Sequence, residues 1–231
     1  MNLTVYLYAV FLIAVKEIKG LKNYKFLSGN SNVDKVCAVN YRVFTKVGVS
    51  GTIECATECS ETNGCDAIFF SSVNGSCIGC RKLTDLSSAL VASTTNVFYQ
   101  LVNENFLEWH YGKSRYFLDV SKTMNYSDAK VHCQLFGAHV VVPDSQDEQN
   151  FLIDRLSSTT DVSLTFMGII DPTFTHAFLA EHSGTTVNYA YWAPGQPAGY
   201  DRLCTSMYLG HGWKWHNNDC YYSYHVVCEY E

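Results

Sequence analysis

Charge is scarce in this sequence. Only 16% of the residues are charged, and 16 Lys and Arg are outnumbered by 22 Asp and Glu, which gives a formal net charge of -6. No run of basic residues occurs. The composition therefore argues against a nucleic-acid partner and against binding to an anionic membrane surface.

Short catalytic motifs are also missing. The sequence has no His-Glu-x-x-His pair, no phosphate-binding glycine loop, no dinucleotide-binding fingerprint and no Gly-x-Ser-x-Gly elbow. Its eight histidines are scattered, and His216 near Asp201 and Asp219 is interpreted as a lone loop histidine rather than an acid–base catalyst. We therefore expect a binding protein with no catalytic residue, not an enzyme.

Long apolar runs are absent except at the N-terminus, where Leu3 to Val15 is almost unbroken. This run is short for a membrane span and typical of a signal-peptide core, and Gly20 offers a small residue for cleavage. No basic residue precedes the run, so a buried or anchoring N-terminal helix is the alternative. We expect residues 1–20 to be a signal peptide, and a secreted, extracellular product with no membrane insertion after cleavage.

Cysteine, in contrast, is abundant. In a secreted chain ten cysteines favour disulfides, although Cys55-x3-Cys59 and Cys77-x2-Cys80 also have zinc-like spacing. Two even sets, separated by about fifty residues, indicate two modules, predicted at 21–102 and 106–231 with a boundary at Asn103-Glu104-Asn105. The first set contains Cys37, Cys55, Cys59, Cys65, Cys77 and Cys80, and the second contains Cys133, Cys204, Cys220 and Cys228.

The first module reads as one helix on a small antiparallel sheet. SGTIECATECSETNGC predicts a helix with Thr52 as N-cap and Glu54 in its first turn, followed by the strand DAIFFSS, a turn at Asn74-Gly75 and the strand NVFYQLV. Helix cysteines followed by a cysteine-bearing hairpin resemble the PAN/apple family, in the version found in nematode secreted proteins. Which cysteines pair in this module stays open at this stage.

The second module predicts an α+β fold. A helix is expected from about Ser127 to Gly137, a strand at His139 to Val142, a second helix from about Ser145, and then the strands FMGIID, LCTSMYL, GWKWH and HVVCEY. With the loop WAPGQPAG and the spacing Cys220-x7-Cys228, this order resembles the short form of the C-type lectin-like domain. The resemblance implies the bridges Cys133–Cys228 and Cys204–Cys220, and a cis bond at Gln196-Pro197.

In sugar-binding members of that family, five side chains around the Pro197 loop hold calcium. Carried onto this sequence, the places are Gln196, Ala198, Arg202, His216 and Asn217. Calcium takes six to eight oxygen ligands, usually with several carboxylates, and this set contains no carboxylate and one fixed cation. Shifting to Asp201 or to Asn218-Asp219 misdirects the side chains. The sequence therefore disfavours calcium here, and we predict neither a cofactor nor a metal.

Recognition without calcium is the function that the resemblance then implies. The candidate ligand-binding residues are Gln196, Tyr200, Asp201, Arg202, His216 and Asn217, with Tyr221–Tyr224 beside them, whereas Trp192 and Trp215 are expected to be buried. We expect an extracellular glycan or protein ligand, in a surface or innate-defence setting. The alternatives are a structural or matrix interaction protein with the lectin-like unit as scaffold, and a calcium-dependent lectin.

Two sequons predict N-glycosylation if the chain enters the secretory path. They begin at Asn74 and Asn125, which lie at an expected turn and an expected helix start.

Overall fold

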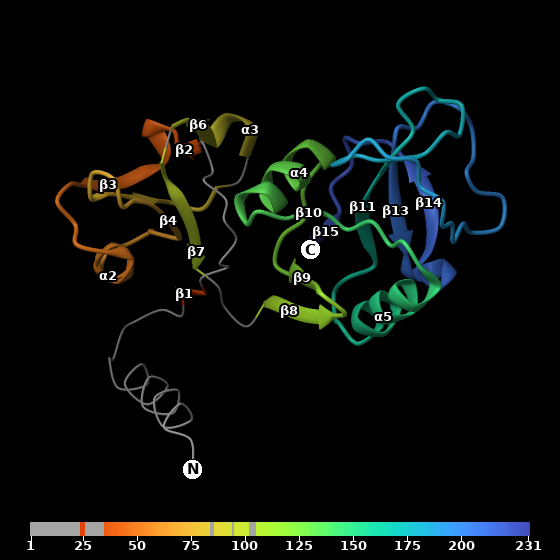
Figure 1. Ribbon diagram of the computed structural model, residues 1–231, viewed down its shortest axis with the longest axis horizontal. Helices are drawn as coiled ribbons and strands as arrows, with labels where there is room; N and C mark the ends of the chain where they lie inside the picture. The colour runs from red at the N-terminus through yellow and green to blue at the C-terminus, as the bar shows by residue number, and fades with distance from the viewer. Residues whose placement is uncertain (1–23, 26–34, 84–85, 94, 102–104) are drawn as a thin grey trace, which may run out of the picture. The chain divides into compact units, whose positions relative to one another are not determined.

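The computed structural model describes residues 24–25, 35–83, 86–93, 95–101 and 105–231. The chain divides into two compact units: the C-terminal one runs from Glu104 to Glu231, and the N-terminal one contains most of the described residues before it (Figure 1). The predicted signal peptide and the first two residues of the predicted boundary, Asn103-Glu104, lie outside the described residues. Among the residues that are described, no helix is long and apolar enough to cross a membrane.

The N-terminal unit is built on a five-stranded sheet of order β1-β7-β4-β5-β3, whose neighbours pair antiparallel. A two-stranded sheet, β2-β6, and three short helices complete it. The elements are β1 (Tyr24–Lys25), β2 (Lys35–Cys37), η1 (Val39–Tyr41), β3 (Arg42–Lys46), α2 (Thr52–Glu61), β4 (Ala67–Ser71), β5 (Ser76–Cys80), α3 (Leu86–Ala89), β6 (Leu90–Ala92) and β7 (Val97–Leu101).

The N-cap of helix α2 lies one residue earlier than the sequence predicts. The N-cap is Gly51, so the prediction of Thr52 as N-cap is wrong: Thr52 is the first helical residue. Glu54 lies in the first turn as predicted, and its carboxylate accepts from the Ser50 N–H at 2.9 Å and the Ser50 hydroxyl at 2.7 Å. These hydrogen bonds lower the pKa of Glu54. The acid, rather than a threonine hydroxyl, fixes the helix start.

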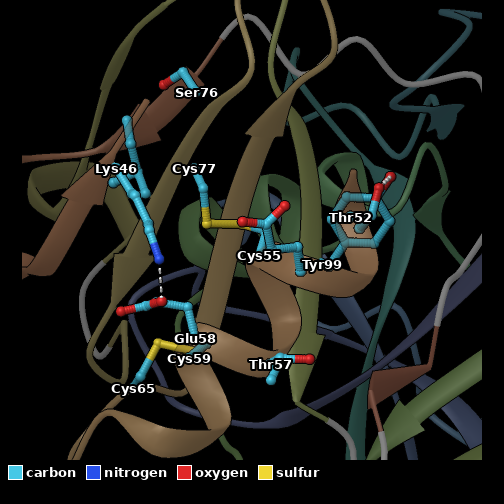
Figure 2. The surroundings of a disulfide bond; sticks show 12 residues. Lys46, Thr52, Cys55, Thr57, Glu58, Cys59, Cys65, Ser76, Cys77 and Tyr99 are labelled. Atoms are coloured by element: carbon cyan, nitrogen blue, oxygen red, sulfur yellow. Dashed lines mark hydrogen bonds and ion pairs between the residues drawn. A yellow bond between two sulfur atoms is a disulfide. The ribbon is translucent and has the colours of Figure 1, made fainter. Parts of the chain in front are cut away.

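Three disulfides staple this unit, with the pairs Cys37–Cys80, Cys55–Cys77 and Cys59–Cys65. Figure 2 shows Cys55 on α2 joined to Cys77 on β5, with Lys46 of β3 bonded to Glu58 at 2.6 Å beside it. All six sulfur-bearing residues are fully buried. Because a unit of this size has little apolar core, the bridges carry much of its stability.

The β4–β5 hairpin turns at Asn74-Gly75, as the sequence predicts. Gly75 has φ +60°, and a Cβ there would lie 2.9 Å from the Val49 carbonyl oxygen. The Asn74 side chain accepts from the Ser76 N–H at 3.0 Å. A glycine is therefore required by both the backbone angle and the crowding.

The C-terminal unit is a mixed sheet with two helices, so the α+β prediction is confirmed for it. The strand order is β14-β13-β11-β15-β9-β8, with β10 beside β15 and β12 beside β11. The β11–β15 pair is parallel and the other pairs are antiparallel. The elements are β8 (Phe106–Tyr111), β9 (Ser114–Asp119), α4 (Tyr126–Leu135), β10 (His139–Val140), α5 (Gln146–Ser157), β11 (Leu164–Ile170), β12 (Leu179–Ala180), β13 (Cys204–Tyr208), η2 (Leu209–His211), β14 (Lys214–Asn218) and β15 (His225–Tyr230).

Side-chain caps start both helices of this unit. Asn125 accepts from the Asp128 N–H at 3.0 Å and so starts α4 just before the predicted Ser127. Ser145 accepts from the Glu148 N–H at 3.3 Å and starts α5 as predicted. Gly137, at φ +69°, follows α4 where the sequence places its end.

Both bridges that the resemblance implies are present. Cys133–Cys228 joins α4 to β15 across 95 residues of sequence, and Cys204–Cys220 joins the start of β13 to the segment after β14 across 16 residues. No cysteine of the chain is free. The longer loop is expected to constrain the unfolded chain more strongly.

The core of this unit lies between α5 and the sheet. Trp213 and Trp215 are each 1% exposed and pack with Leu152, Leu156 and Met207. Trp215 is buried as the sequence predicts, and Trp192 is partly buried against the same core. This packing fixes β14, the strand from which the candidate loop is held.

Candidate functional site

The candidate loop lies between β12 and β13 and returns to β14 before Pro194. The Ala193 N–H donates to the Trp215 carbonyl at 3.0 Å, and the Trp215 N–H donates to the Tyr191 carbonyl at 2.9 Å. The Gln196-Pro197 bond is cis, as the resemblance implies, and Gly195 and Gly199 on either side have φ +77° and +71°. The backbone around Pro197 is therefore set by glycines and by a buried strand.

Asn217 closes this loop by hydrogen bonds. Its side-chain oxygen accepts from the Ala198 N–H at 2.8 Å, and its side-chain nitrogen donates to the Ala198 carbonyl at 2.9 Å. The Gln196 side-chain oxygen accepts from the N–H groups of Ala198 and Asn217, at 3.2 and 3.3 Å. Asn217 is only 1% exposed. The two carboxamides that could offer oxygen to a cation are thus already bonded to backbone.

Arg202 adds a positive charge to the same place. Its guanidinium donates to the Asn217 carbonyl at 3.4 Å, and its charge contributes to a lowered pKa of His216. Calcium needs a cluster of oxygens that bring negative charge. A methyl group at Ala198, two engaged carboxamides, an imidazole and a fixed cation do not fit that ion.

The alternative ligand positions are also unsuitable. Asp201 is exposed, whereas the Asn218 side chain turns into the sheet and donates to the Ser206 hydroxyl at 2.5 Å. Asp219 lies near the tyrosines after β14: after the hydrogen bond to Tyr222 it raises the pKa of Tyr221, and after burial and Tyr222 it raises the pKa of Tyr224. The carboxyl groups of Asp201 and Asp219 therefore occupy different surroundings from the carboxamides of the Pro197 loop.

A stack of aromatic rings runs from the core to the exposed end of this loop. Tyr200, 68% exposed, stacks on His176 with ring centroids 4.4 Å apart and planes 12° apart. The His176 Nε2 atom is 2.7 Å from the Gly199 carbonyl oxygen. Behind His176 lie Phe178 at 6.1 Å and then Trp192, which contacts Trp215. His176 thus supports one face of the Tyr200 ring, while most of the residue is exposed to solvent.

Sequence reasoning missed His176. Its position is built by Asp171, a buried carboxylate that accepts from the N–H groups of Thr175 and His176 at 3.2 and 2.7 Å. His176 and Phe174 both have positive φ. A buried Asp that accepts from N–H groups four and five residues later is typical of a loop fixed by its own side chains, but only the contact with Tyr200 shows the relevance of His176.

Tyrosines after β14 form a separate exposed group. Tyr221 and Tyr222 are 71% and 44% exposed, and their ring centroids are 4.6 Å apart. Tyr224 is half-buried against Phe166 and Tyr222. Tyr221 and Tyr222 are thus available for contact as the sequence suggests, while Tyr224 contributes to packing.

A polar cavity of about 440 Å³ lies elsewhere in the unit, between β9, the start of α5 and the segment after β12. Two buried carboxyl groups share its floor: the Tyr116 hydroxyl is 2.6 Å from Glu148 Oε1 and 3.3 Å from Glu229 Oε1. The N–H groups of Asp144 and Val142 donate to their other oxygens, at 2.8 and 3.2 Å. Sequence reasoning did not single out this pair.

Burial and, after it, the neighbouring Glu229 raise the pKa of Glu148 to about 7. Burial also raises the pKa of Glu229. Two carboxyl groups this close resist double ionisation. No group of three or more His, Cys, Asp or Glu side chains in the described part of the chain is arranged to hold a metal ion.

The two sequons differ in their surroundings. Asn74 is exposed at the hairpin turn. Asn125 is half-buried, and its side-chain nitrogen, the atom to which a glycan is attached, donates to Asp128 at 3.0 Å. Asn74 is therefore the more accessible of the two predicted sites.

Comparisons with known proteins identify the C-terminal unit. Residues 122–230 match the family model described as Lectin C-type domain. The chain is 30% identical over 119 residues to human C-type lectin domain family 10 member A, covering 46% of this chain and 34% of that protein. It is 26% identical over 119 residues to Collectin-10 of Xenopus tropicalis, covering 50% and 42%. The chain thus spans about a third to a half of the length of these curated relatives.

Among solved structures, the chain is similar to human lithostathine, with a TM-score of 0.49 and 24% sequence identity. The match covers 56% of this chain and 99% of that chain. The family match and the sequence relatives show that the C-terminal unit contains a C-type lectin-like domain. The resemblance in the second module is thereby confirmed.

Proposed function

We propose that this chain is a secreted recognition protein whose C-type lectin-like domain binds an extracellular glycan or protein without calcium at the Pro197 loop. The observation that carries this proposal is the bonding of Asn217 to Ala198, because it holds the loop through hydrogen bonds within the chain. Ala198 and Arg202 supply no oxygen ligand, and Arg202 adds a charge of the wrong sign.

The ligand surface in this proposal is the exposed end of the same loop. Tyr200 is mostly exposed, with Asp201 and Arg202 next to it in sequence. Aromatic residues and arginine are the residue types that most often contribute the largest part of the binding free energy at interfaces. Gln196 and Asn217 hold the loop in this arrangement, so these two serve as supports rather than contacts.

The N-terminal unit is proposed to be a PAN/apple-like domain. One helix stapled by disulfides to an antiparallel sheet supports this, as the sequence pattern did. Five disulfides support an oxidising, extracellular location for the whole chain. The proposed setting is surface recognition or innate defence, with a glycan on Asn74.

A glycan array probed with the full chain in calcium and again in EDTA tests the proposal. We expect the same binding pattern in both buffers. Binding that disappears in EDTA would contradict it. The absence of a glycan signal in either buffer would favour a protein ligand or the structural alternative. The triple variant A198N/R202E/N217D is the matched control, because it restores oxygen ligands at the same positions.

A further inference from the structure

Two histidines face each other at the hairpin between β13 and β14. The Nδ1 atom of His211 lies 2.8 Å from the Nε2 atom of His216, and the two rings are stacked with centroids 4.8 Å apart. His211 is exposed and His216 is half-buried. The two ring nitrogens therefore meet at a place that solvent can reach.

The backbone holds this pair in place. β13 and β14 pair in register from Cys204–Asn218 to Tyr208–Lys214, and η2 closes the hairpin with Gly212 and Trp213 at φ +66° and +60°. Trp213 is 1% exposed, and its indole N–H donates to the Ser157 hydroxyl at 2.9 Å. Because the short hairpin is anchored in the core, the two histidines are already close together. A ligand that binds both of them therefore loses less free energy to ordering the site.

The surroundings of the pair contain a tyrosine and one cation. The Tyr208 ring meets both imidazoles edge to face, with centroids 5.3 and 5.6 Å away. Burial, then His211 and then Arg202 lower the pKa of His216. Neutral imidazole is the form that binds metal ions. The charge of Arg202 opposes any cation at this place.

We propose that His211 and His216 together bind a divalent transition-metal ion of the class that prefers imidazole nitrogen, with Zn²⁺ as its representative. Imidazole suits zinc, copper and nickel, whereas calcium takes oxygen ligands. Because metal ions bind the neutral form of imidazole, the hydrogen between Nδ1 and Nε2 moves to the other nitrogen of its own ring, both facing nitrogens bind the ion, and the neutral pair releases no net proton. Water completes the coordination, which leaves open positions on the metal.

Isothermal titration of the full chain with ZnCl₂ at pH 7.5, with CaCl₂ as the comparison, tests this site. Substituting H211Q or H216Q removes one ligand, and since the loss even of outer-shell partners costs about 10–100-fold in metal affinity, we expect a loss of at least about tenfold for zinc. R202Q should strengthen zinc binding, because it removes the opposing charge. The control is H182Q, which alters the other close histidine pair, His139–His182, whose rings stack 3.7 Å apart.

The proposal is overturned if wild-type protein takes up no zinc, or if H211Q binds zinc as tightly as wild type. It is also overturned if H182Q removes binding while H211Q retains it. His211 lies exposed on the turn, so H211Q decides the question even if H216Q lowers the melting temperature in metal-free buffer. Zinc uptake by wild type and H182Q, together with its loss in H211Q, supports the site.

Discussion

The carboxamide of Asn217 makes two hydrogen bonds to the backbone of a single residue, Ala198, at 2.8 and 2.9 Å. These two residues lie 19 positions apart, one on β14 and the other directly after the cis Gln196-Pro197 bond. The pair ties the loop to a strand that is itself fixed by Trp213 and Trp215. The geometry of the loop after Pro197 is thus fixed by a side chain of β14.

Replacing Asn217 with Ala is expected to destabilise the C-terminal unit. The substitution removes the Asn217 partner of the Ala198 carbonyl and one of the two acceptors of the Ala198 N–H, at a position where Asn217 is 1% exposed. The cost of such buried groups is about 1–3 kcal/mol in the free energy of unfolding. Urea denaturation measures it, and N188A, on an exposed loop, should change stability by no more than about 0.5 kcal/mol. Equal stabilities of N217A and wild type would show that the pair is dispensable.

Stability should depend on pH through Glu148. Its pKa is raised from 4.5 to about 7, first by burial and then by Glu229. The folded state therefore retains a proton that the unfolded state has lost. This contribution is fully present below pH 4.5 and is lost as the pH rises through about 7. We expect E148Q, which is neutral at every pH, to gain stability relative to wild type between pH 5.5 and pH 8.

The measurement is urea denaturation of both proteins at the two pH values. The difference in unfolding free energy between the two proteins cancels the contributions of other titrating groups. One of these is His132, whose pKa burial lowers to about 3, so that its contribution to stability increases with pH. E148Q and wild type that respond to pH in parallel would contradict the raised pKa of Glu148.

How far sequence alone could predict this structure depends on whether a feature is local. Helix α5 and its cap Ser145 follow from neighbouring residues, and so do the turn at Gly75 and most strands. The burial of Trp215 follows from residue chemistry and the family pattern, and the absence of calcium stays a prediction. Thr52 failed as an N-cap because Glu54 reaches back to Ser50 instead, a choice between two locally adequate caps.

Features that need contact between distant segments were beyond sequence reasoning. Tyr116, Glu148 and Glu229 share one cavity although the first and last are 113 positions apart, and the hydrogen bond between them exists only because β9 pairs with β15. Likewise, the role of His176 follows from its stacking on Tyr200, which is distant in sequence. The disulfides of the N-terminal unit could be assigned only from the structure, in which α2 lies against β5.

The two disulfides of the C-terminal unit should differ in their contribution to stability. Cys133–Cys228 closes a loop of 95 residues and Cys204–Cys220 one of 16. In the chain-entropy treatment these lengths correspond to about 4.7 and about 3 kcal/mol. Urea denaturation of C133A/C228A should therefore show a greater loss than that of C204A/C220A. A reversed order would indicate that packing around the short bridge outweighs loop closure.

Tyr200 offers the sharpest test of the ligand surface. Its ring is 68% exposed and supported from behind by His176, so Y200A removes contact area without opening the core. Using a ligand found on the array, we expect Y200A to lower affinity roughly tenfold, since an exposed tyrosine at the centre of an interface contributes more than about 1 kcal/mol. Y200F keeps the ring and should retain most of the affinity. The unfolding free energy of Y200A should fall by no more than about 1.5 kcal/mol, the value of one aromatic pair. Unchanged affinity in Y200A would place the ligand elsewhere, and the exposed pair Tyr221 and Tyr222 would be the next surface to substitute.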